Sequence, residues 1–200
     1  MGNRHSRPFI RYVLMVGVGS FVFTVCFSLF AETSIKGLRS IILPALLIVL
    51  SVLFNVVFDI IGTSATAADE APFHARAAKR LRGAQESINL IKNADKVANF
   101  ANDVVGDIAA TIAGALGISL ALKIAHRWSL ADVIMLNVII TSLIASITVV
   151  GKAIGKRIAV SRANEVIFLV GQLLAFSHRT GGEKPFNNRK AGQGNRPFRR

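Results

Sequence analysis

Four apolar segments dominate the sequence, and each is long enough to cross a lipid bilayer. They cover residues 10–30, 41–61, 104–125 and 130–150. A hydrocarbon core of about 30 Å requires roughly 20 apolar residues in a helix. Inside that core the backbone must satisfy its own hydrogen bonds, so such a segment spans as a helix. The sequence therefore predicts an all-α membrane protein with about four transmembrane helices.

Composition favours the same class and argues against most others. Of the 200 residues, 52% are hydrophobic and 18% are charged, whereas soluble domains carry about 25% charged residues. The single cysteine, Cys26, lies inside the first apolar segment, which excludes a disulfide framework. The sequence contains no Walker loop, GxSxG, HExxH or zinc-ligand spacing. We therefore do not expect an enzyme.

The first apolar segment follows the basic stretch GNRHSRPFIR and has two interpretations. It is either a cleaved signal peptide or a retained transmembrane helix. Its length exceeds the 7–15 residues typical of a signal-peptide core, and no clear A-x-A site follows it. We prefer the retained helix.

The distribution of Lys and Arg predicts the orientation. The net charge is +13, and 20 of the 24 Lys and Arg residues fall at the N-terminus, between the second and third spans, or after the fourth. The other four are Lys36, Arg39, Lys123 and Arg127. Cytoplasmic segments carry the positive excess in membrane proteins. Both termini are thus predicted to be cytoplasmic, in a cell inner membrane.

A basic amphipathic helix is predicted between the second and third spans. Its apolar positions recur at spacings of 4, 4, 3, 4 and 3, namely Phe73, Ala77, Leu81, Ala84, Ile88 and Ile91. The opposite face carries Arg76, Lys79, Arg80, Arg82 and Glu86. Pro72 suits an early helical position, Gly83 permits a bend, and Asn93 is a candidate N-cap after a break. Such a helix lies in the membrane interface with its basic face toward anionic lipid headgroups, or simply toward solvent.

The C-terminal part contains a shorter apolar segment and a polar tail. Residues 163–176 are too short for a span and predict a second interfacial helix. The tail, residues 177–200, is rich in Gly, Asn and Arg and is predicted to be disordered. Its aromatic and basic motifs suit lipid headgroups better than RNA, so no nucleic-acid partner is expected.

Several polar side chains fall inside or beside the spans, where they are costly unless they face a protein interior. Asp59 lies near the end of the second span, one turn after Asn55. The third span opens with Asn99, Asn102, Asp103 and Asp107 at helical spacing. The first three of these have a second interpretation as helix-capping residues. Carboxylate, amide and hydroxyl oxygens are also the ligands of Mg²⁺, so an oxygen-lined cation site is chemically reasonable.

The order of these parts resembles the transmembrane domain of the CNNM/CorC magnesium-transporter family. That domain has a small-residue break after a span, a basic cytoplasmic helix, an Asn-rich span opening and a G-E-x-x-P-K junction. The corresponding pieces here are TSATA (63–67), RGAQESINLIKNADK (82–96), NDVVGDI (102–108) and GKAIGKRIA (151–159). The resemblance covers about residues 41–176, lies in order and spacing, and includes no CBS-pair domain. It implies a magnesium site lined by Asp59, Ser64, Asn102, Asp103 and Asp107, and a homodimer.

Two departures from the family pattern bear on that site. Ala65 stands where the family has the glutamate of the break. Lys152 stands where the family has the junction glutamate that contributes to its Mg²⁺ site. A lysine there repels a divalent cation. Lys152 instead offers a cation that can pair with Asp59, Asp103 or Asp107.

These observations divide the chain into three parts and leave two functions open. The parts are a basic segment with an extra transmembrane helix (1–40), a CNNM/CorC-like domain (41–176) and the tail (177–200). The expected function is transport or homeostasis of a divalent cation such as Mg²⁺. The alternative is a non-transporting scaffold or regulatory protein that binds a partner or anionic lipid. The spacing Gly151-x-x-x-Gly155 suggests close helix packing.

Overall fold

The computed structural model describes residues 6–36, 40–128 and 132–180, and every regular element in these ranges is a helix. The elements are α1 (Ser6–Lys36), α2 (Ile42–Ala67), α3 (Ala71–Ala78), α4 (Ala84–Lys92), α5 (Ala94–Ala98), the π-helix η1 (Asn99–Gly106), α6 (Asp107–Trp128), α7 (Val133–Ser161) and α8 (Ala163–Thr180). The predicted all-α class is confirmed. The predicted tail lies almost entirely outside the described residues.

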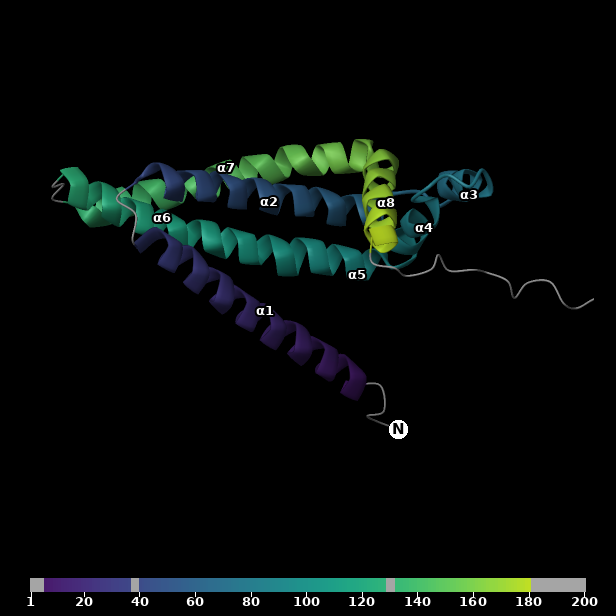
Figure 1. Ribbon diagram of the computed structural model, residues 1–200, viewed down its shortest axis with the longest axis horizontal. Helices are drawn as coiled ribbons and strands as arrows, with labels where there is room; N and C mark the ends of the chain where they lie inside the picture. Colours follow the sequence, from purple (N-terminus) through teal and green to yellow (C-terminus); the bar gives the residue numbers. More distant parts are fainter. Residues whose placement is uncertain (1–5, 37–39, 129–131, 181–200) are drawn as a thin grey trace, which may run out of the picture.

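Three long helices form the body of the molecule. Figure 1 shows α2, α6 and α7 running side by side, with α8 lying across one end and α3 and α4 beyond it. Helix α1 diverges from this body at an angle, and its N-terminal end lies toward the α8 end. Within the described residues, three helical stretches are long and apolar enough to cross a membrane, namely Ile42–Ala67, Ala94–Trp128 and Val133–Ser161. The apolar part of α1 found there is shorter, Leu14–Cys26.

Helix α2 does not break at TSATA, so the predicted break is wrong. The helix continues through Ala67. The hydroxyls do not interrupt it because they bond to nearby carbonyls: Thr66 Oγ1 donates to the Thr63 carbonyl at 2.9 Å, and Ser64 Oγ donates to the Ala159 carbonyl of α7 at 3.3 Å. The chain leaves the helix only at Ala68, whose backbone is extended.

Small residues let α7 approach α2 closely. A Cβ atom on Gly151 would lie 2.8 Å from Val56 Cγ2, and one on Gly155 would lie 2.9 Å from Ile60 Cγ1. The GxxxG spacing therefore packs two helices of the same chain. Toward the N-terminal end of α2, Ile48 joins a buried apolar cluster with the α6 residues Ile108, Ile112 and Leu116.

Helices α3, α4 and α8 form a cap over one end of the body. Phe73, Ile88 and Ile167 from the three helices are buried together with Ala65 at the end of α2. The predicted amphipathic helix is split into α3 and α4, and the bend expected at Gly83 is confirmed, because the chain turns there with a φ of 83°. Nearby, the α8 backbone nitrogen of Gln172 would lie 2.5 Å from a Cβ on Gly83, so glycine is required there.

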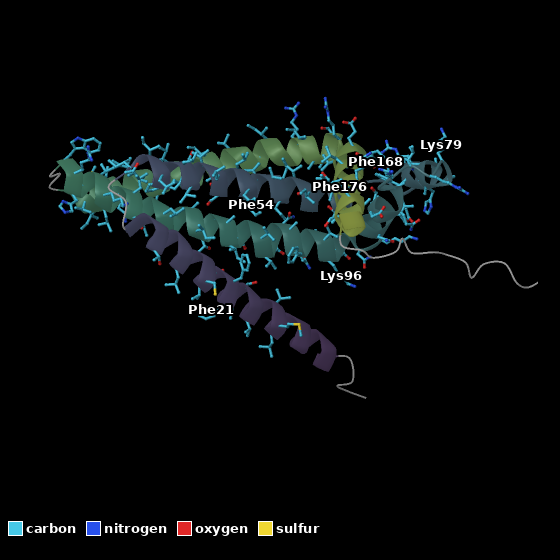
Figure 2. The ribbon with its side chains drawn as sticks, viewed as in Figure 1. Phe21, Phe54, Lys79, Lys96, Phe168 and Phe176 are labelled. Atoms are coloured by element: carbon cyan, nitrogen blue, oxygen red, sulfur yellow. The ribbon has the colours of Figure 1, made fainter. Side chains whose placement is uncertain are left out.

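The cap also contains the predicted break after α4. Helix α4 ends at Lys92 and α5 begins at Ala94, so the break expected before Ala94 is confirmed. Asn93 does not act as an N-cap, because its side chain points back and Nδ2 donates to the Asn89 carbonyl at 3.0 Å. Figure 2 shows Lys79 and Lys96 at this end of the molecule.

Candidate functional site

An ion pair joins α2 to α7 inside the body. Lys152 Nζ lies 4.0 Å from Asp59 Oδ1. The Asp59 side chain is 5% exposed and the Lys152 side chain 27%. The sequence left three acids open as partners for Lys152, and the structure pairs it with Asp59.

Asn55 lies one turn before Asp59 on the same side of α2. It is fully buried, and neither its Oδ1 nor its Nδ2 has a hydrogen-bond partner among the described residues. Gly106 of η1 faces it: a Cβ there would lie 3.3 Å from Asn55 Oδ1 and 4.0 Å from Lys152 Nζ. The absence of a side chain at Gly106 thus brings η1, Asn55 and Lys152 to one place.

Asn102 of η1 approaches α2 one turn further along, beside Gly62. The asparagine amide fills the place that a Cβ on Gly62 would take. Asn102 Oδ1 is buried and, within the described part of the chain, has no hydrogen-bond partner. Because Asn99–Gly106 lie inside one continuous helical stretch, the capping interpretation of Asn99, Asn102 and Asp103 is wrong.

We call Asn55, Asp59, Asn102 and Lys152 the polar cluster. Besides the two amides, Asp59 Oδ2 is also buried without a partner in the described structure. A buried polar atom left unpaired costs about 1–3 kcal/mol. One unpaired carboxylate oxygen and two unpaired amide oxygens on neighbouring turns of α2 and η1 therefore form an environment that favours a bound donor or cation. The π-helix beside them belongs to a class of distortion that is frequent at functional sites.

The other predicted site residues lie apart from this cluster. Asp103 and Asp107 are exposed on η1 and α6. Ser64 is buried and donates to α7 instead. Across residues 6–36, 40–128 and 132–180, no three His, Cys, Asp or Glu side chains gather to hold a metal ion.

The residues present still fit one kind of metal site. Mg²⁺ typically uses one or two carboxylates, keeps several waters and accepts other oxygen ligands. Asp59 would supply the carboxylate, and Asn55 and Asn102 would supply amide oxygens. The contribution of Asn55 was visible in the sequence only as its position one turn from Asp59. The π-helix and the Gly106 contact had no sequence signal.

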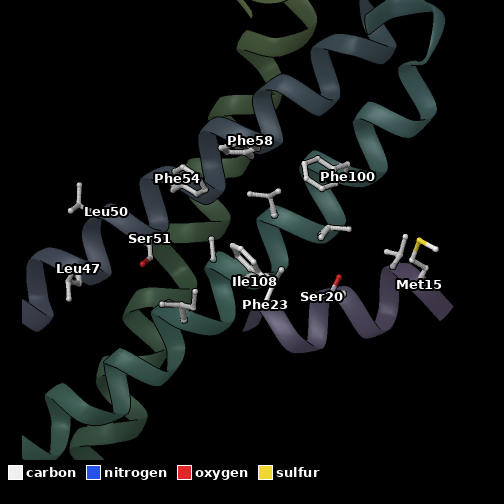
Figure 3. Close-up of a pocket in the computed structure, with 16 residues that line it drawn as sticks. Met15, Ser20, Phe23, Leu47, Leu50, Ser51, Phe54, Phe58, Phe100 and Ile108 are labelled. Carbon is white, nitrogen blue, oxygen red and sulfur yellow. The ribbon is translucent and has the colours of Figure 1, made fainter. Parts of the chain in front are cut away.

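An apolar cleft lies on another side of α2, between α2, α1, η1 and α6. Its volume is about 770 Å³. Figure 3 shows Phe54 and Phe58 of α2, Phe100 of η1 and Phe23 of α1 around it. Ser20 and Ser51 are the polar side chains that line it. The cleft thus offers hydrophobic surface and almost no hydrogen-bonding groups.

A second set of charges lies outside the long apolar helices, where α2 leads into α3. Glu70 Oε1 lies 2.9 Å from His74 Nε2 and 3.4 Å from Lys92 Nζ. The hydrogen bond from His74 is the main cause that lowers the pKa of Glu70 below its ordinary value, and Lys92 adds to it. The side chains of this group are 38–57% exposed, so water reaches their polar atoms, unlike those of the polar cluster.

No protein-family model matches the sequence, and no match is found among curated proteins or solved structures.

Proposed function

We propose that this protein spans the cell inner membrane four times, with both termini in the cytoplasm. The large apolar side chains on the outside of the body support this, because Leu53, Leu143 and Val149 are 57%, 59% and 67% exposed. Helix α1, the first apolar segment of the chain, would add one span to the three of the body. Its exposed apolar residues include Met15 and Phe21. The basic cap then lies at the cytoplasmic interface, beside anionic lipid headgroups.

Within that membrane protein, we propose that the polar cluster binds a cation and serves its transport or homeostasis. The observation that carries this is the set of buried, unpaired oxygens on Asn55, Asp59 and Asn102. A buried carboxylate inside a span is costly and tends to mark an ion pathway. Mg²⁺ is the cation we propose first, since its oxygen-rich chemistry matches these ligands and the sequence resembles CNNM/CorC transporters.

The cluster lies toward the capped end of the body, which suits access from the cytoplasm. Asp59 is eight residues before the end of α2 at Ala67, and Ala65 is already packed under the cap. A cation entering there would exchange part of its water shell for the carboxylate and amide oxygens. Movement of α7 against α2 would then open the site to the other side, and the glycine contact between them is where such sliding would occur.

The non-transporting scaffold remains a second candidate because one observation favours it. Lys152 already neutralises Asp59 at 4.0 Å. A permanent pair would hold α7 on α2 and leave no net charge for an external cation. In that case the cap and its lipid contacts would carry the function.

Magnesium binding to the purified protein tests the proposal. We expect millimolar Mg²⁺ to raise the unfolding temperature in detergent, since a ligand stabilises the state that it binds. Asp59→Asn should abolish the shift, whereas Asp107→Asn should keep it because Asp107 is exposed. Loss of the shift in both variants, or in neither, would contradict the assignment to the polar cluster. Flux of ²⁸Mg²⁺ into liposomes then separates transport from binding alone.

A further inference from the structure

We infer that Lys152 is a built-in competitor for the cation site, so that an external cation binds only when the lysine ammonium leaves Asp59. This inference rests on the proposed function and adds its regulation. It begins from the position of Nζ, which lies 4.0 Å from Asp59 Oδ1 and 4.0 Å from where a Cβ on Gly106 would be. The ammonium thus stands where a cation bound to Asp59 would stand.

No other described acid replaces Asp59 as a partner for that ammonium. On η1 and α6, Asp103 and Asp107 are exposed rather than turned into the cluster. On α7, Lys156 is exposed one turn beyond Lys152 and adds positive charge at the same end. The cluster therefore has one carboxylate, Asp59, and an external cation would have to compete with the Lys152 ammonium for it.

Lys152 has a route out of the cluster. Its side chain is 27% exposed, whereas Asp59 is 5% exposed. Lysine has a long flexible stem that can lie along apolar surface while its ammonium reaches a polar region. Lys156 and Arg157, both exposed and further along α7, show that this direction leads to a polar region. The lysine can therefore move while the carboxylate stays.

Simple electrostatics makes the two states exclusive. Two cations within a few ångströms of each other in a low-dielectric site repel strongly. A side chain tethered beside its partner also acts at a high effective concentration, in the millimolar range for short flexible links. An external cation must therefore bind better than this tethered ammonium, so the apparent affinity of the wild type is reduced by the competition.

Removing the competitor tests the inference. In detergent-solubilised full-length protein, we expect Lys152→Gln to bind Mg²⁺ at least tenfold more tightly than the wild type by isothermal titration. Lys152→Arg keeps the charge and should keep the weaker binding. Lys156→Gln removes a neighbouring lysine that is outside the cluster and should leave the affinity unchanged.

Amine labelling in the wild type gives a second readout that does not depend on any variant folding. If the ammonium leaves Asp59, Lys152 should react faster with an amine-specific reagent when Mg²⁺ is added, as measured by mass spectrometry. The reaction of the exposed Lys156 serves as the internal control. Unchanged labelling of Lys152 at saturating Mg²⁺ would contradict the inference.

The outcomes separate this inference from the proposed function. If wild type and Lys152→Gln bind Mg²⁺ equally well, the competitor idea is overturned and the cation site stands. If neither binds, both are overturned. If only Lys152→Gln binds, the lysine is confirmed as the occupant, and the wild-type protein is the locked scaffold rather than a transporter.

Discussion

Two neighbouring rows of one helix, α2, meet opposite environments. Phe54 and Phe58 line an open apolar cleft, whereas Asn55 and Asp59 are buried against η1 and α7. The rows are one residue apart in sequence, about 100° around the helix. The aromatic row requires no specific partner, while each polar atom of the other row requires one. The same helix can therefore tolerate change on one side and be sensitive to it on the other.

The largest expected effect comes from removing the buried charge. Asp59→Asn leaves the Lys152 ammonium without its partner, and breaking a fully buried pair costs about 3–5 kcal/mol. Because Lys152 is 27% exposed and can move outward, we expect a loss of about 2–3 kcal/mol in the free energy of unfolding. Unfolding in mixed detergent micelles would measure it.

Two controls define this first test. Leu50→Met, one turn before Phe54 in the cleft wall and 50% exposed, should change stability by less than about 0.5 kcal/mol. The double variant Asp59→Asn with Lys152→Gln should recover part of the loss, because no charge is then left unpaired. Equal losses for Asp59→Asn and Leu50→Met would remove the distinction between the two rows.

A smaller effect is expected from adding one methyl group beside the polar cluster, and almost none from adding one in the wall of the apolar cleft. Gly62→Ala places its Cβ where the Asn102 amide lies, so the asparagine must move, and overpacking of this kind costs about 1–3 kcal/mol. Gly19→Ala in the cleft wall of α1 meets nothing within 4 Å. It should be neutral or stabilising by up to about 1 kcal/mol, because alanine favours a helix.

Binding makes the comparison of the two glycines sharper. Moving Asn102 should also weaken Mg²⁺ binding in Gly62→Ala, since its amide oxygen is one of the unpaired acceptors. Gly19→Ala should bind as the wild type does. If Gly62→Ala kept full stability and full affinity, Asn102 would not belong to the polar cluster.

The sequence predicts the elements of this molecule better than their contacts. The length of the apolar segments was enough to predict the three long helices of the body. The apolar spacing and the basic opposite face predicted the amphipathic segment that forms α3 and α4. Polar spacing pointed to Asp59 and Asn102 but also to Asp103 and Asp107, which are exposed. Spacing gives the face of a helix, whereas the helix that covers that face is decided by packing.

The parts that escaped prediction depend on local details of that packing. By sequence, three acids were equally good candidates for an ion pair with Lys152. Gly151 and Gly155 pack α7 closely against α2, and this contact places Lys152 beside Asp59. The small residues of TSATA were expected to break α2. They continue it instead, because α7 accepts the Ser64 hydrogen bond and the cap covers Ala65.

The smallest effect tests the contrast between the buried pair and an exposed one. Glu70 has a pKa held below its ordinary value, first by the His74 hydrogen bond and then by Lys92. A carboxylate with a lowered pKa stabilises the fold above its unfolded value of about 4.3, and that contribution is lost as the pH falls through the folded pKa. The stability difference between wild type and Glu70→Gln should therefore shrink from pH 6 to pH 3.5. The destabilisation by Glu70→Gln should remain well below that by Asp59→Asn throughout, because water screens the exposed pair.

Two control variants identify the cause of this pH dependence. Replacing His74 with Gln should reduce the pH dependence more than replacing Lys92 with Gln, because the His74 hydrogen bond is the larger cause of the lowered pKa of Glu70. If the stability difference between wild type and Glu70→Gln grew on acidification, the sign argued here would be reversed.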